Sequence, residues 1–164
     1  ACYWLEGRAY EHAYAWNKIY RRQLFCNVRF PVGRVFEDVA TLPLLLDNAR
    51  RVATTHLGMY YFCINQQGIT ATAQSRQLQM LLEAHLDAMH RWCDNRYYMH
   101  VFNIQADVYA LTGAEPVLPV RNVSPFDMKL SAGSKLKAMA VTVLGIERTC
   151  KIIKTIHRWK RPNH

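Results

Sequence analysis

The 164-residue chain lacks the short motifs that identify many enzymes and metal proteins. It contains no Gly-rich phosphate loop, no G-x-S-x-G, no H-E-x-x-H and no Asp-x-Asp. The sequence therefore gives no sign of a nucleotide loop, a serine hydrolase or a zinc protease. Its five cysteines are scattered and include no C-x-x-C pair, which argues against a structural zinc site and against a disulfide framework. We expect no metal ligands in this chain.

Long apolar runs are also missing. The longest nearly unbroken run, 138–146, is well short of the roughly 18 residues that cross a bilayer. The sequence begins at Ala1, without a Met, and its first residues do not have the pattern of a secretory leader. These features predict a cytoplasmic protein, and the missing Met leads us to expect further sequence upstream.

Acidic residues are scarce near the C-terminus. The whole chain carries 21 Lys and Arg against 12 Asp and Glu, a net charge of +9. From Lys135 onward there are eight basic residues and one acid, Glu147. We expect residues 133–164 to form a basic amphipathic helix, from about Ser134 to Trp159, that docks on an anionic membrane surface. The alternative, in which this helix packs on the domain, stays open.

Helical periodicity is present in the second half of the chain. Apolar residues recur at helical spacing from Leu78 to Cys93. A further helix is expected from about Tyr97 to Leu111, with Gly113 as its stop.

The first half predicts mixed structure. A leucine-rich helix should begin near Thr41 or be kinked at Pro43. The run 52–64 is rich in β-branched and aromatic residues and predicts one or two strands, with Tyr60 and Tyr61 in their core. The expected fold class is α+β, mostly helical in the second half.

One acidic pair has two interpretations. Glu37 and Asp38 follow a Gly-containing turn and precede an apolar helical run. Such acids commonly accept hydrogen bonds from the free N–H groups of a first helical turn, where the helix dipole also favours negative charge. The other interpretation is a catalytic carboxylate, and the flanking stretches bear on it.

Three stretches, in this order and spacing, resemble bacterial family 2 inverting glycosyltransferases. They are AWNKIYRRQLF (15–25), VRFPVGRVFEDVATLPLLLDNARRV (28–52) and MYYFCINQQGIT (59–70). The resemblance implies that the chain is the acceptor-side portion of a Rossmann-like GT-A enzyme. Its nucleotide-binding half, with the Asp-x-Asp that holds Mn or Mg, would then lie upstream of Ala1.

The resemblance also implies roles for individual residues. Asp38 matches the family's general base and Glu37 its supporting partner. Trp16, Asn17 and Lys18 match a segment close to the acceptor and the sugar-nucleotide. For Trp16 core packing is the alternative, and for Lys18 a solvated surface charge.

The implied function is transfer of a single sugar, with inversion, from a nucleotide-sugar donor to a glycan or lipid-linked acceptor. A Gln-x-x-Arg-Trp motif of polymer-forming relatives is absent, and residues 63–67 lack the basic residue that would grip the diphosphate. The implied segments are 1–70 (catalytic, acceptor side), 71–132 (helical extension) and 133–164 (basic helix).

This segment alone should be inactive, and attachment would be peripheral, at the cytoplasmic face of the inner membrane. The alternative function is a non-enzymatic basic helical module that binds nucleic acid. Against that alternative, the basic residues gather in the tail and the chain has no nucleic-acid-binding motif.

Overall fold

The computed structural model describes residues 1–58, 60–63, 65–68 and 72–160, with side chains described to residue 156. Its contacts divide the chain into two compact units, Ala1–Trp92 and Cys93–His164. We call them unit 1 and unit 2. The segments 1–70, 71–132 and 133–164 divide the chain by predicted role, and that division stays a prediction.

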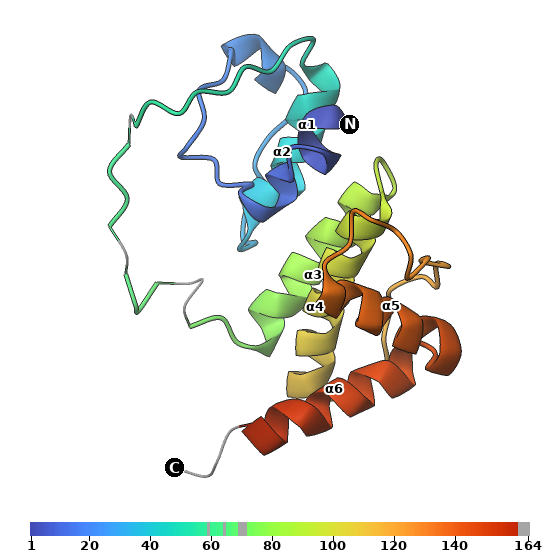
Figure 1. Cartoon of the computed structure of the whole chain (residues 1–164). Helices are drawn as coiled ribbons and strands as arrows, with labels where there is room; N and C mark the ends of the chain where they lie inside the picture. The colour runs from blue at the N-terminus through green and yellow to red at the C-terminus, as the bar shows by residue number, and fades with distance from the viewer. Residues whose placement is uncertain (59, 64, 69–71, 161–164) are drawn as a thin grey trace. The chain divides into compact units, whose positions relative to one another are not determined.

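Unit 1 contains short and long helices joined by loops (Figure 1). They are α1 (Cys2–Leu5), η1 (Ala9–Glu11), η2 (Arg22–Phe25), α2 (Glu37–Asn48) and α3 (Ser75–Met89). Helices α2 and α3 pack on each other. At the start of α3 a capping box joins Gln74 and Gln77, since each side chain accepts from the other's backbone N–H.

The expected α+β class is wrong. Throughout the described ranges the regular structure is entirely helical, with no strand and no sheet, so a Rossmann-like GT-A architecture is not found. The described part of the predicted strand region, 52–58 and 60–63, is irregular, while Met59 and Ile64 lie outside the described residues. A β-rich run forms a strand only where another strand pairs with its N–H and C=O groups, and here none does.

Helix α2 starts at Glu37, so Pro43 lies inside it. Of the two predicted alternatives, the start near Thr41 is wrong, and the helix instead continues through Pro43. Phe36 precedes it in the left-handed region, with φ of 58°, which is uncommon for a residue other than glycine. The buried side chains of α2 include Leu42 and Leu45. Burial of this apolar face therefore stabilises the helix despite the hydrogen bond that proline removes.

Unit 2 is built on α4 (Asn95–Thr112), which packs against α6 (Ile146–Lys160). The Asp94 side chain caps α4 by accepting from the Tyr97 N–H at 2.8 Å, and Gly113 ends it with φ of 70°. The helix begins two residues before the predicted Tyr97, and its stop at Gly113 is as predicted. The buried Gln105 Oε1 accepts from the backbone N–H groups of 117 and 118, which holds the following loop against α4.

The expected single C-terminal helix is wrong. Gly145, with φ of 80°, separates α5 (Ala132–Leu144) from α6 (Figure 1). The two helices pack on each other, and Ile146 and Cys150 are buried, whereas Leu136 remains 65% exposed. The apolar residues of 133–156 therefore do not form one continuous face. Docking on an anionic membrane surface remains a prediction.

Within the described residues, every helix is too short or too polar to cross a membrane.

Candidate functional site

Asp38 lies in the first turn of α2, one residue after the helix begins. Its Oδ1 accepts a hydrogen bond from the Val39 N–H at 2.8 Å. The residue in the N-cap position is Phe36, whose side chain makes no capping bond. Asp38 is thus not the N-cap residue itself, although it satisfies one donor of the first turn.

The environment of Asp38 disfavours its charged form. Burial raises the pKa of this carboxyl above its ordinary value of 3.8, and the neighbouring charge of Glu37 raises it further. The Val39 N–H and the Lys18 ammonium act in the opposite direction and lower the pKa, but burial has the larger effect. A carboxylate with a raised pKa is a stronger base than an exposed one, which favours proton abstraction.

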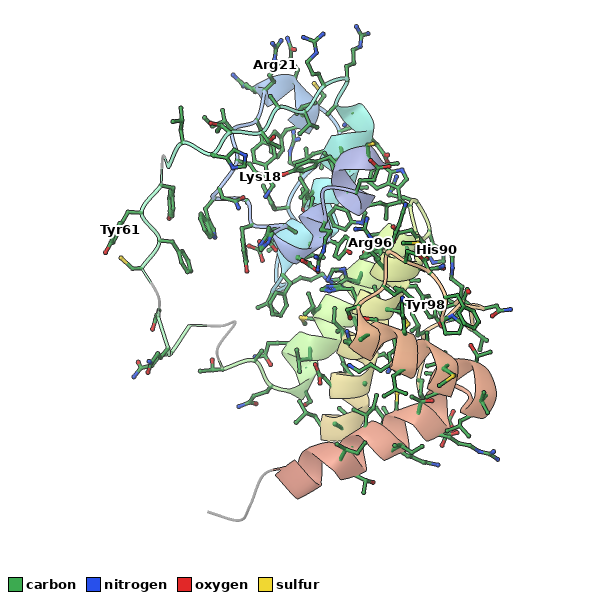
Figure 2. The ribbon with its side chains drawn as sticks, in the orientation of Figure 1. Lys18, Arg21, Tyr61, His90, Arg96 and Tyr98 are labelled. Carbon is green, nitrogen blue, oxygen red and sulfur yellow. The ribbon has the colours of Figure 1, made fainter. Side chains whose placement is uncertain are left out.

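Lys18 is the cation that faces Asp38. Its Nζ donates hydrogen bonds to the carbonyl oxygens of His12 at 2.7 Å and Tyr14 at 2.8 Å, and to Asn17 Oδ1 at 2.6 Å. Burial lowers the pKa of Lys18 to about 8, against the attraction of Asp38, which raises it. Figure 2 shows Lys18 on the N-terminal loop. It is therefore not the freely solvated surface charge of the alternative interpretation.

Trp16 is the centre of a group of aromatic rings, which we call the ring stack. Its ring centroid lies 5.2 Å from that of Tyr14, 4.8 Å from Tyr60 and 4.7 Å from Phe62. All three pairs are stacked, and the Trp16 and Phe62 planes differ by 4°. Trp16 is 39% exposed, so it is not a core residue.

The prediction that Tyr60 and Tyr61 form a strand core is wrong. Tyr60 is 59% exposed and belongs to the ring stack, and Tyr61 is 88% exposed. In Figure 2 Tyr61 projects away from the chain. No sheet covers them in the described part of the chain, and these side chains face solvent.

The structure brings most of the predicted site residues together within unit 1. Lys18 joins Asp38 to the ring stack, because it interacts with the Asp38 charge and also holds the backbone of Tyr14. Asn17 contributes as an acceptor for Lys18, and Glu37 is exposed beside Asp38. Sequence reasoning assigned Tyr14, Tyr20 and Phe62 no role at the site. The clustering of aromatics before Lys18 was the available signal for Tyr14.

Tyr20 completes the surroundings of Asp38. Burial raises the pKa of Tyr20 to about 12, and the charges of Tyr3 and Asp38 add to the effect. Its phenol therefore stays protonated at neutral pH and is able to donate a hydrogen bond.

Neither a metal-binding cluster nor a similar known protein assigns a further role to this site. The part of the chain that the structure describes contains no cluster of three or more His, Cys, Asp or Glu able to hold a metal ion. The Mn or Mg expected for the intact enzyme, with ligands outside this chain, remains a prediction. Comparison with protein-family models, with curated protein sequences and with solved structures gives no match.

The titration of Lys18 tests its proximity to Asp38. In NMR spectra of protein with 13C-labelled lysine, the Lys18 Cε signal should titrate with a midpoint of about 8. Replacement of Asp38 by asparagine removes a negative charge that favours the ammonium, so the midpoint should fall further. A Lys18 midpoint near the ordinary 10.5, or one unaffected by Asp38→Asn, would show that the two groups do not interact.

Proposed function

We propose that this chain supplies the acceptor side of an inverting sugar transfer from a nucleotide-sugar donor. Asp38 acts as the general base that takes the proton of the attacking acceptor hydroxyl. The observation that carries the proposal is a half-buried carboxylate with a raised pKa, linked through Lys18 to an exposed ring stack. The roles proposed here are those implied by the resemblance of residues 15–70 to family 2 glycosyltransferases.

The chemistry requires a base because a hydroxyl is a poor nucleophile until its proton is removed. In an inverting reaction the acceptor oxygen attacks the anomeric carbon opposite the departing nucleotide, and its proton passes to the Asp38 carboxylate. One well-placed carboxylate contributes about 10²- to 10⁴-fold to such a step. Desolvation by a bound acceptor would raise the Asp38 pKa further and strengthen this base.

The ring stack is suited to contact with a sugar. Sugar rings present C–H faces that pack on aromatic faces, and tyrosines add a hydroxyl that forms hydrogen bonds. Tyr14 and Tyr60 are 38% and 59% exposed, which leaves ring surface open to such a ligand. We assign the glycan part of the acceptor to this surface.

Trp16→Ala should weaken sugar binding by at least about fivefold, because it removes the central ring on which the others stack. Saturation-transfer NMR on the full chain, with the methyl glycosides of glucose, galactose and N-acetylglucosamine, measures this effect. Tyr61→Ala is the matched control, since it removes an exposed aromatic ring that lies between Tyr60 and Phe62 in the sequence but outside the ring stack. Equal loss in both variants, or no binding of any of these glycosides by the wild type, would contradict the assignment.

A further inference from the structure

A hollow of about 930 Å³ lies beside η2 in unit 1. We call it the arginine pocket, and it is lined by Arg21, Arg22, Gln23, Phe25, Cys26 and Arg29. All six residues belong to the stretch 21–29, so the pocket is formed within one unit. Figure 2 shows Arg21 at the outer edge of this unit. The lining therefore contains three guanidinium groups and no carboxylate.

The arginines of the pocket differ from other arginines of unit 1 in their charge partners. Elsewhere in unit 1 Arg34 pairs with Glu83 at 2.9 Å, and Arg91 pairs with Asp47. Among the described residues, none of the three pocket arginines forms an ion pair. Three like charges around one hollow repel each other, and a bound anion would remove that repulsion.

The pocket is also partly pre-organised. The Arg29 Nη1 donates to the backbone carbonyl oxygen of Val28 at 2.8 Å and to that of Phe25, which fixes its guanidinium at the wall. The Phe25 ring packs edge-on against Tyr20, with centroids 5.6 Å apart, and lies 6.0 Å from Phe30. Arg29 and the Phe25 ring are thus already held in place before a ligand binds, which lowers the entropic cost of binding.

We propose that the arginine pocket binds the phosphoryl group of a phosphate ester. A guanidinium forms two parallel hydrogen bonds with phosphate oxygens, and a group with two negative charges matches several arginines better than a single carboxylate does. The apolar wall accommodates the organic part of the ester. This inference stands on the pocket and is independent of the proposed sugar transfer, although Tyr20 connects the pocket wall to the surroundings of Asp38.

Calorimetric titration of the full chain with inorganic pyrophosphate tests the proposal. The wild type should bind it saturably, and Arg21→Gln/Arg22→Gln should weaken binding by at least about tenfold, because two charged donors are lost. The matched control is Arg50→Gln/Arg51→Gln. It removes the same charge from another exposed arginine pair of unit 1, and binding should change by less than about twofold if the pocket is the site.

Two further ligands, titrated in the same way, distinguish a soluble phosphate ester from a lipid headgroup. Glycerol 3-phosphate represents a soluble ester, and phosphatidylcholine vesicles containing phosphatidic acid represent a lipid headgroup. Vesicles with an equal fraction of phosphatidylserine control for surface charge. Loss of glycerol 3-phosphate binding in the pocket variant indicates a soluble ligand, and loss of a preference for phosphatidic acid indicates a lipid. Equal weakening of pyrophosphate binding in the two arginine variants, or no saturable binding of inorganic pyrophosphate by the wild type, overturns the proposal.

Discussion

Replacement of Asp38 by asparagine should lower kcat by about 10²- to 10⁴-fold in the complete transferase that the proposed function requires. Asparagine keeps the oxygen that accepts the 2.8 Å hydrogen bond from the Val39 N–H, so the first turn of α2 should be preserved. It cannot take up the proton of an acceptor hydroxyl. Steady-state kinetics of sugar transfer, with thermal unfolding of both proteins, separates loss of the base from loss of structure.

Two comparisons sharpen this test. Asp87→Asn removes an exposed carboxylate from α3 and should leave kcat unchanged, and Glu37→Gln should cost less than Asp38→Asn. Because burial raises the Asp38 pKa above 3.8, activity should fall as pH decreases through that raised pKa and the base becomes protonated. An Asp38→Asn enzyme with near-normal turnover would reduce Asp38 to a first-turn hydrogen-bond acceptor.

Phe102→Ala should lower the free energy of unfolding of unit 2 by about 3–5 kcal/mol. Phe102 is fully buried in α4, with no exposed surface, and its neighbours Val101 and Tyr98 are equally buried. Removal of the ring leaves a cavity that a helix held by α6 cannot fill by collapsing. Hydrogen exchange of the α4 amide groups, measured by mass spectrometry on the full chain, reports the local free energy of opening.

The control for this change lies on the same helix. Leu111 is 60% exposed, so Leu111→Ala should alter the free energy of unfolding by less than about 0.5 kcal/mol. If Phe102→Ala also cost less than 1 kcal/mol, on the order of a surface substitution, the packing of α4 described above would be wrong.

Much of unit 2 and the end of unit 1 could be predicted from local pattern. The leucine spacing of α3, the periodic run of α4 and its stop at Gly113 all depend on residues within a few turns of each other. Gly145, where the C-terminal segment divides into two helices, is visible in the sequence. The helical spacing of apolar residues nevertheless continues across it. Whether such a glycine breaks a helix depends on what the two halves pack against, which is a tertiary property.

The strand prediction failed for a related reason. Residues 52–64 have the composition of a strand, but a strand exists only when another segment supplies the ladder of hydrogen bonds. The rings of this segment instead contact Trp16, more than 40 positions earlier in the sequence. No local sequence pattern predicts this contact between the rings and Trp16.

By itself the sequence determined the candidate residues and the long helices, because residue chemistry and helical spacing are local properties. Only the tertiary structure decided how the site is assembled. It brought Lys18 into the field of Asp38, 20 positions away, and buried both enough to shift their pKa values in opposite directions. Burial and through-space charge depend on which segments meet after folding, and these are the quantities that turn an ordinary acidic residue into a candidate base.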